Sequence, residues 1–597
     1  MNKLTNIKFL WLILPLLAVF SCNDQQFLTE KPKTFYTTSN AFSSSDQVDQ
    51  AVVGCYSYVR YMYNLVGQND PWIAFKGANG TDLMDVPTIR RGNTFNDYGV
   101  ITPSHTVFNT VYSAFYQLIE RANLAIYAAD LPQITWSSQT DKAYVMAQAR
   151  FFRAFAYRNL CELYGGVPIV KEIVTAPRYD FERATRVQTY QFAIDEVEAV
   201  LNDLPVTTAT KGRLTKGAAQ HLLCQLYLDK GLAIEADGGG ADPKAAYQKA
   251  IDNGNAVIDG GTYSLMTSRF GTRSTQNPDY YYASTFALQT SDHLYSKAGY
   301  PITANVYWDL FQEGNQDYQA GNKEAIWVTQ VNYSAYKTED KESFLPYSRV
   351  FGGVFRDAMS THTTGTLEDV GGRGIAQAIP NMYTRDVIYS DKWATDMRNS
   401  EAVNRRTVLG NVPASPYYGK AIPWSILYRD GQAKDAVDAA KTECFPISCK
   451  VSTDKYTGVA DGENESNLFR GEYIMRLSET ILLRAEAKMR IGDKAGAASD
   501  INLVRTRANC GYMVTAADVS VDLILDERAR ELIYEETRWN TLLRMGGTVA
   551  VDRIKKYAYW DAPRNTLTSN FNLWPIPQNV IDTNKDKPMA QNPGWNK

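Results

Sequence analysis

The chain has 597 residues and a formal net charge of −3, because 62 lysines and arginines nearly balance 65 aspartates and glutamates. This length suffices for several domains or for one large domain. The balanced charge offers neither a basic surface for nucleic acid nor one for anionic lipid, so we expect no nucleic-acid partner.

The N-terminus combines a basic start with an apolar run. The run, FLWLILPLLAVF at 9–20, is too short to span a bilayer comfortably, and the small Ser21 follows it. This pattern predicts a signal peptide over residues 1–21. The tetrapeptide VFSC at 19–22 resembles the lipobox of bacterial lipoproteins, so we expect a lipid anchor on Cys22. An ordinary secretory cut, with Cys22 incidental, is the alternative.

Helical periodicity dominates the next part of the chain, up to about residue 261. Apolar residues recur at steps of three and four from Val145 to Leu163, which is the pattern of one face of an amphipathic helix. Gly165 and Gly166 follow as a helix stop. Further helices are expected at 108–129, 187–203, 215–234 and 243–259.

The chain loses this periodicity in residues 262–470, which are rich in Gly, Tyr, Asn, Ser and Thr. Irregular segments of this length are usually either functional or disordered. The many aromatic residues argue against disorder, because disordered segments are poor in them. We therefore expect an ordered, loop-rich region that carries the ligand site.

Helical patterns return in the last part of the chain. One helix is expected from Ile474 to the stop at Gly492, a second at 497–508 and a third at about 522–545. Alanine-rich helix pairs of this kind resemble tetratricopeptide units, which bury one continuous core when they stack. The sequence thus predicts a mainly α fold, a scaffold of tetratricopeptide-like helical pairs carrying a loop-rich ligand-binding region. The expected domains are 22–261, 262–470 and 471–597.

The most charged segment of these helices is ERARELIYEETR at 527–538. Asp526 and Arg530 are four residues apart, and Glu535 and Arg538 three, so each pair can meet along one helix. Carboxylates held ionised by arginines do not suit a general acid, which needs a raised pKa. We expect an ion-pair lattice that fixes helix against helix.

No catalytic constellation is found in the sequence. The four histidines are scattered, and no G-x-S-x-G, H-E-x-x-H or glycine-rich phosphate loop is present. We expect no catalytic residue, no cofactor and no metal site, except that DGENES at 461–466 offers oxygen ligands suited to a structural calcium ion. A surface glycoside hydrolase stays open as an alternative, because its two carboxylates would meet in space and not in sequence.

The aromatic residues are the main evidence in the sequence for a ligand-binding function. They make up 12% of the chain, with 38 tyrosines against 23 phenylalanines. Tyr and Trp offer a flat apolar face to a sugar ring and a polar edge to its hydroxyls. Rings that lie off helices form an open platform, and Asp82, Arg273 and Asn305 are expected as hydrogen-bonding companions. The predicted ligand-binding residues are Trp72, Asp82, Tyr98, Tyr280, Tyr281, Tyr282, Tyr295 and Trp308.

Several long segments match one known family in that family's own order. They include AQARFFRAFAYRNLCELYGGVPIV at 147–170, ILDERARELIYEETRWNTLLRMG at 524–546 and the closing segment at 574–595. The opening segments FLTEKPKT at 27–34 and GTDLMD at 80–85 match as well. Together they resemble the SusD/RagB lipoproteins of Bacteroidetes over essentially the whole mature chain.

This resemblance implies a surface glycan-binding lipoprotein, held in the outer membrane by its lipid and facing the cell exterior. The family fold is a tetratricopeptide-like scaffold with a loop-rich binding region. The implied partners are an oligosaccharide and a SusC-like TonB-dependent transporter, over which the protein sits as a lid. Peptide uptake, as in RagB-like members, and a structural helical-repeat adaptor without a ligand are the alternatives.

Overall fold

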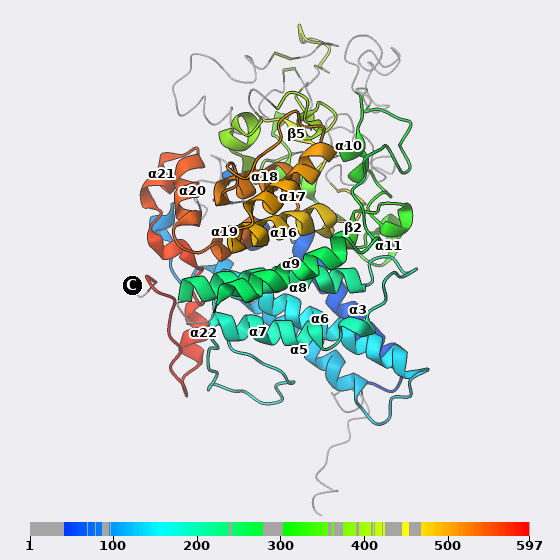
Figure 1. Ribbon diagram of the computed structural model, residues 1–597, viewed down its shortest axis with the longest axis vertical. Helices are drawn as coiled ribbons and strands as arrows, with labels where there is room; N and C mark the ends of the chain where they lie inside the picture. The colour runs from blue at the N-terminus through cyan, green and yellow to red at the C-terminus, as the bar shows by residue number, and fades with distance from the viewer. Residues whose placement is uncertain are drawn as a thin grey trace, which may run out of the picture.

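The computed structural model shows a stack of helices that carries irregular segments at one end (Figure 1). Helices α5 to α7 lie at the lower end of this view, α8, α9 and α16 in the middle, and α10 and β5 towards the top. The structure describes residues 41–67, 70–77, 79–85, 95, 97–237, 242–278, 303–355, 361–362, 374–389, 393–406, 410, 412–418, 420, 422–423, 444–452 and 467–595.

The long helices pack in pairs that follow the chain. Helix α5 packs on α6, α6 on α7, α7 on α8 and α8 on α9, and α16 then packs on both α9 and α17. The mainly helical, tetratricopeptide-like fold predicted from the sequence is therefore confirmed. The long helices are α3 (Ser45–Tyr63), α5 (Thr106–Ala129), α6 (Gln139–Tyr164), α7 (Arg186–Glu198), α8 (Lys216–Asp237), α9 (Pro243–Ile258), α16 (Leu477–Ile491) and α17 (Lys494–Arg507).

Local sequence explains where these helices begin and end. The side chain of Ser138 caps α6, and Thr185 forms a capping box with Gln188 at the start of α7. Gly165 ends α6 with a φ of +75°, a conformation that favours glycine. At Gly166 an added Cβ would lie 1.9 Å from the carbonyl oxygen of Ala184, so the return of the chain to α7 passes directly against the end of α6.

The other described elements are short, and three two-stranded antiparallel sheets join distant segments. Strand β2 pairs with β6, which leads straight into α16, so part of the middle region is fixed on the scaffold. The short elements are α4 (Asp70–Phe75), β1 (Met84–Asp85), η3 (Tyr98–Val100), η4 (Leu201–Asp203), α10 (Val306–Leu310), η6 (Tyr318–Ala320), β2 (Ala325–Val328), α11 (Tyr333–Thr338), α12 (Tyr347–Phe351), β3 (Ile379–Pro380), η8 (Tyr383–Val387), η9 (Met397–Asn399), β4 (Asn404–Arg405), β5 (Ile447–Ser448), β6 (Tyr473–Arg476), α18 (Val521–Leu532), α19 (Arg538–Arg544), α20 (Val549–Tyr557), α21 (Asp561–Thr566), η11 (Ser569–Asn572) and α22 (Gln578–Thr583).

The expectation of one helix over about 522–545 is wrong. The chain forms α18, then breaks at Ile533, and resumes as α19 at Arg538. Tyr534 has a φ of +68°, which no α-helix accommodates. The break turns Glu535 inward, where it accepts hydrogen bonds from Arg476 at 2.8 Å and Lys450 at 2.7 Å. These partners lie outside the segment, so its own periodicity carries no sign of the break.

The expected ion-pair lattice is present, and it is buried. Its centre is Glu531, whose carboxylate pairs with Arg476 at 2.9 Å, with Arg398 at 3.2 Å and with Arg507. Glu324 joins the same group by pairing with Arg476 at 2.9 Å and with Arg507. We call these five residues the Glu531 lattice; each side chain is at most 1% exposed.

The residues of the expected pairs have other partners, which for Asp526 and Arg530 lie on another helix and within α18 itself. Asp526 pairs with Arg553 of α20 at 2.8 Å, and Arg530 pairs with Glu527 at 3.0 Å. The presence of an ion-pair lattice was therefore predicted correctly, but the residues that pair with one another were not. Within the described part of the chain, no helix is long and apolar enough to cross a membrane.

We expect Glu531→Gln to lower the free energy of unfolding by about 3–5 kcal/mol, because it removes the one carboxylate that three buried guanidinium groups share. Denaturant unfolding followed by circular dichroism measures the change. Glu182→Gln is the matched control, since Glu182 pairs with Lys587 at 2.7 Å but is 73% exposed, and it should change stability by less than about 0.5 kcal/mol. Equal effects of the two substitutions would contradict the role given to the lattice.

Candidate functional site

Asp82 lies between α4 and β1 and is fully buried. Its carboxylate accepts two hydrogen bonds from Arg538, at 2.8 and 2.7 Å, and one from Arg553 at 2.7 Å. Burial disfavours the charged form, but the two guanidinium groups outweigh that effect and hold the pKa of Asp82 at about 2. Asp82 thus ties the opening segment to α19 and α20 and presents no oxygen to solvent.

The predicted aromatic residues of the first segment are buried as well. Trp72 is 4% exposed and packs edge-on against Tyr61, with 5.9 Å between ring centroids. Tyr98 is 5% exposed, donates a hydrogen bond to the carbonyl oxygen of Gly80, and packs on Phe571 at 4.7 Å. The expectation that Trp72 lies off helices is wrong, because it is part of α4, which is too short to show a periodic pattern.

Trp308 also lies on a short helix, α10, contrary to the expectation that it lies in a loop. Asn305 caps this helix by accepting hydrogen bonds from the backbone N–H groups of Tyr307 and Trp308. The indole is 2% exposed, since the guanidinium groups of Arg273 and Arg269 cover its ring at 4.4 and 5.4 Å from the centroid. The half-buried Arg273 therefore stands between the Trp308 ring and solvent.

The remaining predicted residues are Tyr280, Tyr281, Tyr282 and Tyr295, and they lie outside the described residues. The same holds for Cys22 and for the loop at 461–466. Direct ligand contact by the predicted residues, lipidation of Cys22 and a calcium ion at 461–466 therefore stay predictions. The described residues have a structural role: Asp82 fixes the opening segment to α19 and α20, and Trp308 packs beneath Arg269 and Arg273 in the middle region.

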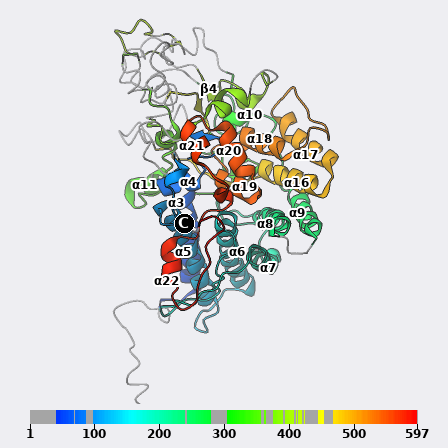
Figure 2. The same cartoon turned by 90° about the vertical axis from the view of Figure 1, so that its left-hand side faces the viewer.

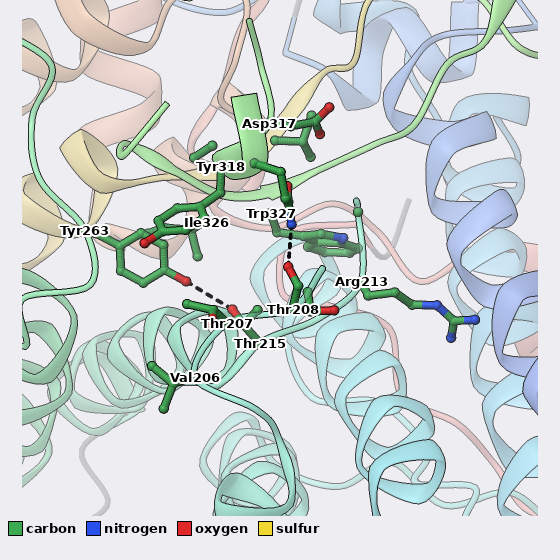
Figure 3. Close-up of a pocket in the computed structure, with 14 residues that line it drawn as sticks. Val206, Thr207, Thr208, Arg213, Thr215, Tyr263, Asp317, Tyr318, Ile326 and Trp327 are labelled. Atoms are coloured by element: carbon green, nitrogen blue, oxygen red, sulfur yellow. Dashed lines mark hydrogen bonds between the residues drawn. The ribbon is translucent and has the colours of Figure 1, made fainter. Parts of the chain in front are cut away.

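Two pockets are too small for a sugar ring. The pocket in Figure 3 has about 30 Å³ and lies between β2 and the connection from α7 to α8. A hydrogen bond of 3.0 Å between the hydroxyls of Tyr263 and Thr215 lies along its wall. A second pocket of about 40 Å³ lies beside α18 and is lined by Lys450 and Arg406. A single water needs roughly 10–15 Å³ of such space, so each pocket has room for a few water molecules and not for a sugar ring.

A larger groove of about 470 Å³ lies on the scaffold between α5 and α22. Sequence reasoning missed it, because its lining comes from α5, the segment 168–181 and the segment 579–589, which are far apart in the chain. The sequence of each segment, taken alone, is typical of an ordinary helix face or of a polar loop, and does not indicate a groove. The groove is large enough for a small ligand.

Two family models match the chain. The model of the SusD family matches residues 284–595, and one described as "Starch-binding associating with outer membrane" matches residues 26–228. The chain belongs to the SusD family. This family consists of non-catalytic glycan-binding proteins associated with the outer membrane, so the prediction that the chain is no enzyme is confirmed.

Individual relatives are similar over nearly the whole chain. "SusD-like protein P2" of Formosa agariphila is 24% identical, and the match covers 98% of both chains. A solved SusD homolog from Bacteroides thetaiotaomicron has a TM-score of 0.65 at 16% identity, covering 94% of this chain and 98% of that one. Surface glycan-binding protein A from the same organism, solved in complex with laminarihexaose, has a TM-score of 0.59 at 18% identity, with 92% and 99% covered.

Asp82 gives a prediction about acid stability. Its folded pKa of about 2 lies below the unfolded value of about 3.9, so its contribution is full above about pH 4 and is lost as the pH falls through 2. Asp82→Asn should therefore destabilise the protein by about 3–5 kcal/mol at pH 7, and the difference from wild type should shrink between pH 4 and 2. Chemical denaturation over a pH series measures this.

The control for this prediction is Asp561→Asn. Asp561 pairs with Arg564 at 2.6 Å, but its side chain is 74% exposed, so the substitution should change stability by less than about 0.5 kcal/mol at every pH. A pH-independent effect of Asp82→Asn would contradict the ion-pair explanation.

Proposed function

We propose that the protein captures an oligosaccharide at the outer surface of the outer membrane and passes it to a SusC-like TonB-dependent transporter. The observation that carries this proposal is the similarity to SusD-family proteins along nearly the whole chain, including a model described as starch-binding. A relative of the same fold holds laminarihexaose. A glycan is therefore favoured over a peptide as the ligand of this chain.

The described part of the chain begins at the scaffold end of the molecule. Gln133, in the connection from α5 to α6, donates a hydrogen bond of 3.4 Å to the carbonyl oxygen of Phe42. The described chain thus starts beside this connection, whereas the irregular segments near α10 and β5 lie at the opposite end (Figure 1). A chain spans at most about 3.3–3.6 Å per residue, which limits how far the lipid on Cys22 lies from Phe42.

The ligand site is proposed for the loop-rich region, at Tyr280, Tyr281, Tyr282 and Tyr295. The described residues at its boundary support this placement, because Arg269 and Asp309 form an ion pair of 2.6 Å that fixes the segment leading into it. Aromatic rings beyond such a fixed base give the flat faces that stack on sugars. Trp72, Asp82, Tyr98 and Trp308 are buried parts of the packing.

Isothermal titration calorimetry against a panel of neutral plant, fungal and host glycans tests the proposal. We expect at least one polysaccharide to bind, and replacement of Tyr280, Tyr281 and Tyr282 by Ala to weaken binding about tenfold or more through lost ring contacts. Tyr127→Ala is the matched control, since Tyr127 is 43% exposed on α5, and it should leave affinity unchanged.

Adding peptides to the panel, and analysing the glycans for breakdown products after incubation, separates the rival functions. Binding of peptides in place of glycans would replace the proposal by RagB-like peptide uptake. Release of shorter sugars during incubation would show a hydrolase. Binding of neither class of ligand would leave only a structural adaptor and would overturn the proposal.

The lipid anchor gives a further prediction. Cys22→Ala should release the protein from the outer-membrane fraction, because the acyl chains provide the stable anchor. Cell fractionation and surface labelling measure this, and the purified variant should bind the same glycan with unchanged affinity. Loss of glycan affinity in the purified variant would contradict a role limited to tethering.

A further inference from the structure

The groove between α5 and α22 lies far from the loop-rich region. In Figure 1 and Figure 2, α5 and α22 occupy the lower part of the molecule, while β5 and β4 lie near the top. Of the predicted ligand-binding residues that the structure describes, Trp72, Asp82, Tyr98 and Trp308, none lines the groove. A ligand bound here would therefore be separate from the site proposed above.

Three of the residues that line the groove are aromatic. Tyr112 and Tyr116 lie side by side on its floor, with ring centroids 4.9 Å apart and planes tilted by 38°. Phe181 stands in the wall, and the Arg178 guanidinium lies 4.8 Å from the centroid of its ring. Val174 adds an apolar side chain that is 46% exposed. Tyr112 itself is 4% exposed, whereas Tyr116 and Phe181 are half-buried, so Tyr116, Phe181 and Val174 supply the apolar surface that a ligand can reach.

Polar side chains surround these faces. Gln117 and Glu120 project from α5, and Asn579 and Thr583 from α22, and all four are exposed. Amide, hydroxyl and carboxylate groups supply both donors and acceptors of hydrogen bonds. The combination of flat apolar faces with a mixed polar rim is the one that suits a sugar ring.

The walls of the groove are held in place by hydrogen bonds. The side chain of Asn123 donates to the carbonyl oxygens of Val170 and Glu172, both at 3.2 Å. On the other side, the side chain of Asn584 accepts from the backbone N–H of Phe181 and donates to its carbonyl oxygen, both at 2.8 Å. The groove is thus formed before a ligand arrives, which lowers the entropic cost of binding.

Charge selects among ligand classes. Glu120 and Glu172 are exposed at the groove, and among the described residues that line it Arg178 is the one cation. Arg178 already pairs with Asp180 at 3.0 Å. An anionic ligand such as a phospholipid headgroup or an acidic sugar would therefore meet uncompensated negative charge. The polar rim in turn disfavours a purely apolar chain.

We propose that this groove is a second binding site, which takes a short neutral oligosaccharide. The proposal rests on the proposed function in so far as both require a glycan ligand. A volume of about 470 Å³ lies within the range of about 300–1,000 Å³ for sites of small ligands. A second site at the scaffold end would let the protein hold one glycan chain at two places or retain two short chains.

Calorimetry with a neutral oligosaccharide that binds wild-type protein tests this proposal. We expect two bound oligosaccharides per chain for wild type and one for Val174→Arg, whose long side chain obstructs the groove. Phe181→Ala should weaken the same site about tenfold or more. Val53→Arg is the matched control, because Val53 is 39% exposed on α3 outside the groove, and it should keep both sites. Unchanged thermal unfolding midpoints show that the variants are folded.

The outcomes separate the two proposals. If no glycan binds wild type, the proposed function fails together with this inference. If one oligosaccharide binds per chain and Val174→Arg leaves the isotherm unchanged, the groove proposal alone is overturned. If Val174→Arg instead prevents copurification with the transporter while glycan binding is unaffected, a protein segment occupies the groove, and this too overturns the proposal. Loss of one site in Val174→Arg, with the other still sensitive to Tyr280–Tyr282, supports it.

Discussion

The carboxylate of Glu531 is the point on which the structure depends, because guanidinium groups from three distant segments converge on it. Arg398 comes from the middle region, Arg476 from the strand before α16, and Arg507 from the end of α17. Burial opposes the charge on Glu531, but these groups hold its pKa well below the usual range. A buried ion pair stabilises the fold only when both partners are present, because a lone buried charge is costly. The lattice therefore forms only when the middle region, the strand before α16 and the end of α17 are all packed against α18.

The lattice also explains why so charged a segment as 527–538 is not catalytic. Glu527 and Glu531 are surrounded by arginines that keep them ionised, and neither has a proton to give at neutral pH. The same chemistry extends to the first segment through Asp82, which pairs with Arg538 and Arg553. Charge in this protein therefore joins the opening, middle and closing parts of the chain.

Sequence reasoning succeeded where structure depends on neighbours along the chain. Apolar periodicity and glycine stops located α5 and α6 and ended α16 at Gly492, because these signals act within a few residues. It failed where partners are remote. The break after Leu532 serves contacts with Lys450 and Arg476, and Asp82 is buried by arginines more than 450 residues further on. The helices that hold Trp72 and Trp308 have six and five residues and show no period.

The separation between scaffold and loop-rich region has a physical consequence for specificity. Short sheets such as β2–β6 and buried residues such as Trp308 fix the middle region on the helices. Exposed residues of this region can change without removing a buried ion pair or a packed ring, so such changes cost little stability. The groove on α5 differs in this respect, because Tyr112 is also packed against Tyr164 in the core. A ligand site built on the scaffold is consequently more rigid and less free to change than one built on the loops.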